Sequence, residues 1–243
     1  MKLYVIQLVQ QLKQEDYCKR MNYATFMQES MEDETMADRL IFSDESTFHM
    51  SGKVNRYNSQ IWGTEKPSTV IEHDHASAKV NVFCAISSRK LYGPFFFFSE
   101  RSVTSNVYLD MLEVWLMPQL DSDSTDYIFQ QDGAPPHWNM EVRTFLKQHL
   151  PKCWIGQSGD ADDVFCSWPL RSPDLTPCDF FIWSYVKDRV YVPPMPKTME
   201  ELKVHICNVL ALVTEQMLQN VWREMDYRLD VVCVTSGSHI KHL

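Results

Sequence analysis

Short apolar runs separated by polar turns dominate the middle of the chain. They are rich in β-branched and aromatic side chains and lie at residues 40–42, 80–86, 95–98, 127–129 and 164–166. Runs of this length and composition are typical of strands buried in a sheet. We therefore predict five strands in this region.

Amphipathic helices are predicted where apolar positions recur every three or four residues. Residues 1–38 show two such stripes, and later stretches with this spacing are 107–116, 139–149, 179–190, 198–213 and a segment around 222–225. The helix from 107 is expected to stop at Met117-Pro118, because proline disrupts a helix interior. Strands first, then strands alternating with helices, predict an α/β or α+β domain with a mixed sheet.

Three aspartates stand at the ends of predicted elements. Asp44 and Asp132 follow the apolar runs of two strands, and Asp179 opens a helix just after a proline. Hard cations such as Mg²⁺ bind carboxylate oxygens and keep several waters, so a few acids plus substrate phosphates complete such a site. Two ions about 4 Å apart can activate a water or a 3′-hydroxyl and stabilise the leaving oxygen. The pattern favours a divalent-metal site, provided that the three acids converge in space.

Composition narrows the class of protein. A content of 44% hydrophobic and 12% aromatic residues excludes a disordered chain, and 243 residues suffice for one elaborated domain or for two. The net charge of −9 argues against binding nucleic acid by overall charge, so any DNA-binding surface has to be local. The seven cysteines lack zinc-site spacing, which predicts reduced core thiols in an intracellular protein. No apolar run is long enough for a bilayer, and the first residues do not form a signal peptide, so no membrane association is expected.

Three short motifs resemble those of the Tc1/mariner superfamily transposases. They are residues 42–45 (FSDE), 131–137 (QDGAPPH) and 172–179 (SPDLTPCD), and residues 61–63 (IWG) and 92–94 (YGP) also resemble that family. Carried over position by position, the resemblance makes Asp44, Asp132 and Asp179 the catalytic metal ligands. Asp179 matches the third acid rather than Asp174, because that ligand follows the second proline of the motif.

The resemblance also implies a fold and an activity. The implied fold is RNase H-like, a mixed five-stranded sheet flanked by helices, with a helical linker remnant at residues 1–38 and a catalytic domain with C-terminal helices at residues 39–243. The implied activity uses two Mg²⁺ or Mn²⁺ ions to cleave DNA at transposon ends and to join the 3′-hydroxyl to target DNA. The family's N-terminal DNA-recognition domain is expected to be missing here. DNA is the expected partner, the nucleus is the expected compartment, and homodimerisation is possible.

Polar residues near the motifs admit a structural or a functional interpretation. Asp174 is expected to tighten its proline-bounded turn. Glu45 points to the opposite face from Asp44 if the strand continues, and is otherwise an auxiliary acid. For His137 two interpretations stand equal, namely orienting a phosphate or water near Asp132 and satisfying a loop carbonyl.

Further polar and aromatic residues lie away from the three acids. Arg171 and Lys187 flank the third motif and could contact DNA phosphates, although exposed basic side chains are usually only solvated. His73 and His75 are predicted to be loop positions rather than a metal pair, and Trp62 a core residue. Two rival functions stay open: a catalytically silent transposase-derived module that binds nucleic acid or protein, and a nuclease that cuts RNA–DNA hybrids.

Overall fold

The computed structural model describes residues 10–51, 78–98 and 102–240. The interpretations of Trp62, His73 and His75, and most of the first helical stripe, lie outside the described residues. Residues 10–12, the end of that stripe, are not helical.

Six strands form one mixed sheet in the described part of the chain, in the order β3-β2-β1-β4-β5-β6. They are β1 (Leu40–His49), β2 (Lys79–Ile86), β3 (Leu91–Phe97), β4 (Ile128–Gln130), β5 (Trp154–Gly156) and β6 (Cys166–Ser167). β2 pairs antiparallel with β1 and with β3, whereas β1, β4, β5 and β6 are joined by parallel pairing. The α/β prediction is confirmed, but the count of five strands missed β5, a strand of 3 residues that ends in Gly156, a residue type depleted in strands.

The parallel pairing of β1 with β4 determines where the first two motifs meet. Phe42 lies opposite Gln130 in this register. Asp44 and Asp132 each follow that pair by two positions, so both are directed toward the same end of the sheet. Because side chains alternate along a strand, Asp44 and its neighbour Glu45 point to opposite faces.

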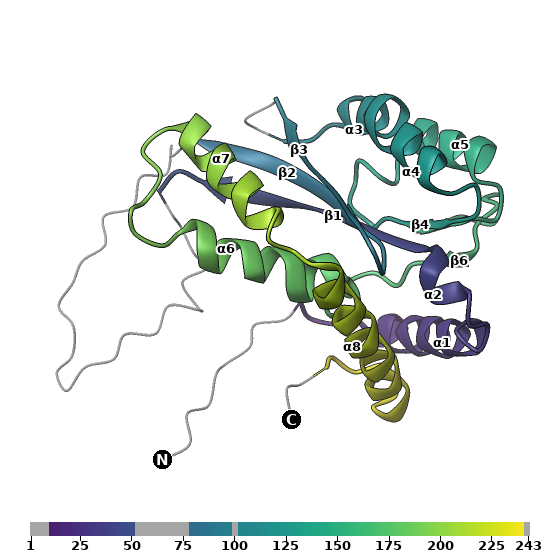
Figure 1. Cartoon of the computed structure of the whole chain (residues 1–243). Coiled ribbons are helices and arrows are strands. Elements are labelled where there is room, and N and C mark those ends of the chain that lie inside the picture. Colours follow the sequence, from purple (N-terminus) through teal and green to yellow (C-terminus); the bar gives the residue numbers. More distant parts are fainter. Residues whose placement is uncertain (1–9, 52–77, 99–101, 241–243) are drawn as a thin grey trace, which may run out of the picture.

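Helices cover both faces of the sheet (Figure 1). One face carries α3 (Ser105–Met111), α4 (Met117–Asp123) and α5 (Met140–His149). The other carries α1 (Gln14–Ser30), α6 (Ser184–Val190), α7 (Met199–Leu210) and α8 (Glu215–Val234), and the short α2 (Met36–Arg39) leads into β1. Each face has its own core, and none of the helices in the described ranges is both long and apolar enough to cross a membrane.

The chain does not leave its helical path at Pro118. α3 continues through a π-helical turn, η1 (Leu112–Leu116), into α4, whose first turn holds Pro118. Proline is tolerated there because the N–H groups of a first turn have no partner within that helix. The prediction of a helix end at Met117 was therefore wrong.

The third motif folds as two short turns before a regular helix. A 3₁₀ turn, η2 (Pro173–Leu175), precedes a π-helical turn, η3 (Cys178–Trp183), which runs directly into α6. Pro177 stands just before η3, and the Asp179 N–H donates to the carbonyl of Thr176 at 2.9 Å. Asp179 therefore sits in the first turn of a continuous helical segment, as predicted.

Candidate metal centre

Asp44 on β1 and Asp179 on η3 lie in contact. Their carboxyl groups lie close enough for each to affect the pKa of the other. Burial and the charges of Asp179, Glu45 and Asp132 raise the pKa of Asp44 well above its ordinary value. Burial and the charge of Asp132 likewise raise the pKa of Asp179. A cation beside the pair would be favoured, because two buried carboxylates close together repel each other.

Trp183 fixes the orientation of the Asp44 carboxyl group. Its indole Nε1–H donates to Oδ2 of Asp44 at 2.7 Å, and the tryptophan is itself buried. Trp183 also packs edge-to-face against Phe48, with ring centroids 6.1 Å apart. A buried donor held by aromatic packing leaves the carboxyl group little freedom to rotate.

His137 bridges Asp132 and Glu45. Its Nδ1 lies 2.7 Å from Oδ1 of Asp132, and its Nε2 lies 3.2 Å from Oε1 of Glu45. Burial alone would lower the pKa of His137, but the two carboxylates outweigh it and raise the pKa to about 10. Burial would raise the pKa of Asp132, but the hydrogen bond and charge of His137 outweigh it and lower that pKa. The main partners of His137 are thus two carboxylates rather than a loop carbonyl, and it orients Asp132 itself.

A buried polar network holds the His137 ring. The Tyr108 ring packs against it with centroids 4.1 Å apart. The Tyr108 hydroxyl donates to Oε1 of Gln131 at 3.0 Å, and Nε2 of Gln131 donates to the carbonyl of His137 at 3.2 Å. Side chains on the α3 face therefore set the position of the second motif.

Asp174 of the third motif and Arg171, which precedes the motif, are engaged away from the three acids. Asp174 receives two hydrogen bonds from Arg20, each 2.7 Å long, so it forms a buried ion pair rather than a simple turn contact. Arg171 donates twice to Asp16, at 2.6 Å in each case. Neither side chain is free to contact a metal ion or a DNA phosphate in this arrangement.

Lys187 of α6 faces the acid pair. Burial lowers its pKa, while the charges of Asp179 and Asp44 favour its protonated form. Its ammonium also lies 5.5 Å from the centre of the Phe48 ring. Lys187 is therefore a partly buried neighbour of the carboxyl pair and not simply a solvated surface lysine.

The donor set fits a hard divalent cation. Asp44, Asp132 and Asp179 offer only carboxylate oxygens, the ligands that Mg²⁺ prefers, and their mutual repulsion favours a cation between them. They do not form one closed shell, because among the described residues no three His, Cys, Asp or Glu side chains are gathered closely enough to hold an ion. Of the three acids, Asp44 and Asp179 therefore lie close together, whereas the Asp132 side chain is turned toward His137.

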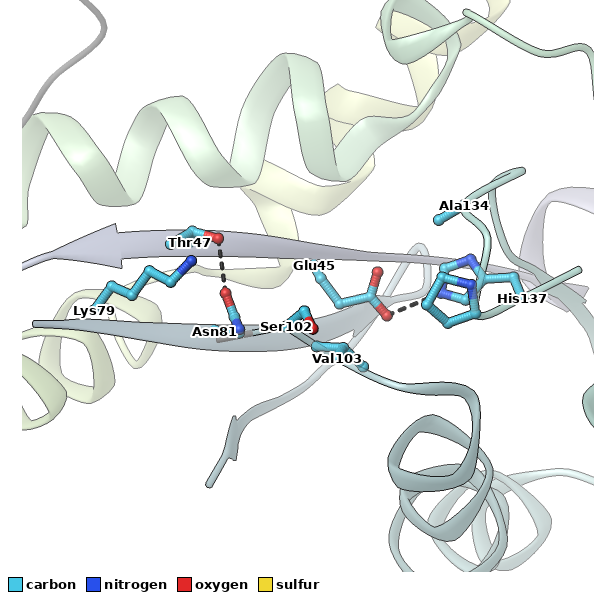
Figure 2. A pocket seen from close by; sticks show the side chains of 9 residues that line it. Glu45, Thr47, Lys79, Asn81, Ser102, Val103, Ala134 and His137 are labelled. Carbon is cyan, nitrogen blue, oxygen red and sulfur yellow. Dashed lines mark hydrogen bonds and ion pairs between the residues drawn. The ribbon is translucent and has the colours of Figure 1, made fainter. Parts of the chain in front are cut away.

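A cavity of about 270 Å³ opens beside the second motif (Figure 2). Residues of β1 and β2 line one side, and the start of α3 and the second-motif loop line the others. His137 and Lys79 lie at opposite ends of the cavity, and between them Thr47 donates to Oδ1 of Asn81 at 2.7 Å. The cavity is therefore lined by both polar and apolar side chains, with Lys79 at one end and the His137–Glu45 pair at the other.

The sequence was compared with those of known proteins. No family model matches the chain. The chain is 27% identical over 209 residues to the Tc3 transposase of Caenorhabditis elegans, a match that covers 84% of this chain and 58% of that protein. This chain therefore spans less than two thirds of the length of that relative.

Solved structures of the Mos1 transposase share the fold. The paired-end complex with the left transposon end matches with a TM-score of 0.78 and 16% identity, over 99% of this chain and 68% of that one. The catalytic domain of Mos1 mariner transposase matches with a TM-score of 0.70 and 15% identity, over 97% of this chain and 100% of that one. The chain is thus similar in sequence to a Tc3 transposase and in fold to the Mos1 transposase. Its fold is RNase H-like, as the three motifs implied.

Two side chains around the candidate metal centre went unrecognised in the sequence. Trp183 could have been found, because it follows Asp179 by four positions and the two share one face of the predicted helix. Arg20 could not, because its partner Asp174 lies 154 residues further along the chain. Only the folded chain brings that pair together.

Proposed function

We propose that this chain is the catalytic part of a metal-dependent transposase. It cleaves DNA phosphodiesters at transposon ends and joins the freed 3′-hydroxyl to target DNA, with Asp44, Asp132 and Asp179 as ligands of two Mg²⁺ or Mn²⁺ ions. The observation that carries this proposal is that Asp44 and Asp179 lie close together and that the charge of Asp132 acts on both.

The chain's own residues prepare the site in three ways. Asp44 and Asp179 have raised pKa values, and both would be anionic ligands of a bound cation, which favours their deprotonated forms. Asp132 remains ionised because His137 keeps its pKa low. Trp183 holds the Asp44 carboxyl group in one orientation. Two divalent ions bound there would supply an activated water or 3′-hydroxyl and stabilise the leaving oxygen.

The cavity beside the second motif is where we place the DNA strand that flanks the scissile phosphate. It begins at His137 and extends along β1 and β2 to Lys79, whose ammonium suits a phosphate oxygen. Thr47 and Asn81 add hydrogen-bonding groups between these ends. A local cation in the cavity allows a chain of net charge −9 to bind DNA at this place.

The compared proteins support the choice of partner and cofactor. The solved structures with this fold include Mos1 paired-end complexes with a transposon end, with Mn and with Mg. On that basis we propose transposon and target DNA as partners, and the nucleus as the compartment. Residues 1–38 as a linker remnant, residues 39–243 as the catalytic domain, and homodimerisation stay predictions.

Calorimetry with Mn²⁺ alone and a nicking assay on transposon-end duplex DNA test this function together. We expect the wild-type chain to bind Mn²⁺ and to nick the duplex, and Asp132→Asn to lose nicking. A folded wild-type chain that binds Mn²⁺ and cuts no DNA would instead support the silent module. Cleavage restricted to RNA–DNA hybrids would support the hybrid nuclease.

A further inference from the structure

Two Arg–Asp pairs join α1 to the loop of the third motif. Arg20 donates to both oxygens of Asp174 at 2.7 Å, and the two side chains are 0% and 8% exposed. Arg171 donates to both oxygens of Asp16 at 2.6 Å, and Asp16 is 1% exposed. Asp16 and Arg20 lie one helical turn apart on α1, so the helix offers one acid and one base to a loop that offers one of each. We name these four residues the α1 clasp.

Arg20 is the fully engaged member of the clasp. A guanidinium has five N–H donors in a fixed plane, and each donor of Arg20 finds an acceptor. Besides the two oxygens of Asp174, the acceptors are Ser172 Oγ at 2.8 Å, the Gly237 carbonyl at 2.8 Å and the Ser238 carbonyl at 3.2 Å. Arg20 therefore fixes the loop relative to both α1 and the C-terminal segment.

A continuous set of contacts leads from Asp174 to Asp179. The carbonyl of Asp174 accepts from Nη1 of Arg228 at 3.0 Å, and the Arg228 guanidinium lies 4.0 Å from the centre of the Phe180 ring. The N–H groups of Asp179 and Phe180 both donate to the carbonyl of Thr176, at 2.9 and 3.1 Å. The backbone that carries Asp179 is thus held from two sides by the segment that Arg20 fixes.

We propose that Arg20 is a positioning residue for Asp179, which it keeps against Asp44 by holding the third-motif loop through the α1 clasp. A buried ion pair is by itself weak evidence for stability, because desolvation offsets much of its attraction. The pair instead fixes how helix and loop are placed relative to each other, because a planar guanidinium bound to both oxygens of one carboxylate permits one arrangement. The expected effect on metal binding rests on the proposed function, whereas the effect on the loop does not.

The first test is Arg20→Lys, which keeps the positive charge and removes the planar guanidinium group. Hydrogen exchange of the amides in residues 176–183 reports how firmly the loop is held, because it includes the Asp179 and Phe180 amides. We expect exchange there to rise about tenfold or more, with unchanged exchange in β1 and β4, and Mn²⁺ affinity to fall in parallel. The matched control is Arg39→Met, because Arg39 forms an exposed pair with Asp126 and should leave both readouts at wild-type values.

The second test is the double variant Arg20→Met with Asp174→Leu. Replacing both members of a buried ion pair by apolar residues is often neutral or stabilising, so this variant separates positioning from stability. We expect a folded protein that still shows fast exchange in residues 176–183 and weakened Mn²⁺ binding.

Wild-type exchange in residues 176–183 in either folded variant overturns the inference. Faster exchange in a chain whose wild-type form binds no Mn²⁺ supports the clasp and refutes the proposed function, so the two failures are distinguishable. Faster exchange with wild-type Mn²⁺ affinity shows that the loop does not position Asp179, and also overturns the inference.

Discussion

Trp183 donates its indole N–H to Oδ2 of Asp44 at 2.7 Å, across 139 residues of sequence. The same helical segment carries Asp179, whose carboxyl group lies close to that of Asp44. One segment therefore supplies both a ligand candidate and the group that orients its partner. Groups that orient metal ligands commonly tune affinity about 10- to 100-fold, which makes Trp183 a sensitive probe of the site.

Replacing Trp183 by Phe keeps an aromatic ring against Phe48 and removes the donor. We expect Mn²⁺ affinity, measured by calorimetry, to fall about tenfold or more. The free energy of unfolding in urea should fall by about 1–2 kcal/mol, because one hydrogen bond to a buried acid is lost. The control is Trp222→Phe, since the Trp222 indole donates to the Ala37 carbonyl at 2.9 Å instead. It should lose similar stability and keep its Mn²⁺ affinity; equal losses of affinity would contradict the role of Trp183.

Asp132→Asn retains the shape of the side chain and removes its charge. We expect Mn²⁺-dependent nicking of transposon-end DNA to fall to background, since a candidate ligand is neutralised. His137 also loses a charged partner, so the free energy of unfolding should fall by about 1–3 kcal/mol, leaving the circular dichroism spectrum of a folded chain. Asp126→Asn, at an acid whose side chain is 66% exposed, is the control and should nick normally. Nicking that survives in the folded Asp132→Asn chain would remove this residue from the site.

The raised pKa values of Asp44 and Asp179 predict how stability changes with pH when a chelator keeps the protein free of metal. Carboxyl groups with raised folded-state pKa values stabilise fully below the unfolded pKa of about 4, and this contribution is lost as pH rises through the folded-state values. Wild-type stability in urea should therefore fall from about pH 5 to about pH 8 more steeply than that of Asp179→Asn. Saturating Mn²⁺ should restore the stability that is lost at the higher pH, and should do so in the wild type only. Parallel pH curves would show that the two carboxyl groups are not coupled.

Lys79→Met tests the cavity as a DNA-binding surface. Removing one phosphate contact should weaken binding of transposon-end duplex uniformly across sequences and reduce the slope of log affinity against log salt by about 1. Fluorescence anisotropy across a salt series measures both. Lys90→Met is the control, because Lys90 is paired with Asp123 and does not line the cavity. An unchanged salt slope in Lys79→Met would place the strand elsewhere.

Local pattern predicted most of the elements that carry the site. Two features escaped it for opposite reasons. The short strand β5 ends in a glycine, which is not typical of a strand, and Pro118 signals a helix end although the chain continues as a helix through a π-helical turn. Asp44, Asp132 and Asp179 were recognisable because each stands at the end of an apolar run or the start of a helix. Their role as metal ligands stays a proposal.

The sequence by itself determined the strand and helix types, the alternation that separates Asp44 from Glu45, and the three acids in order along the chain. Only the tertiary structure decided that Asp44 pairs with Asp179, that His137 binds Asp132 and Glu45, and that Arg20 binds Asp174. Periodicity records which face of an element is buried, because that depends on neighbours a few residues away. The pairing of buried charged side chains depends on how segments far apart in the chain pack together, and no local pattern carries that information.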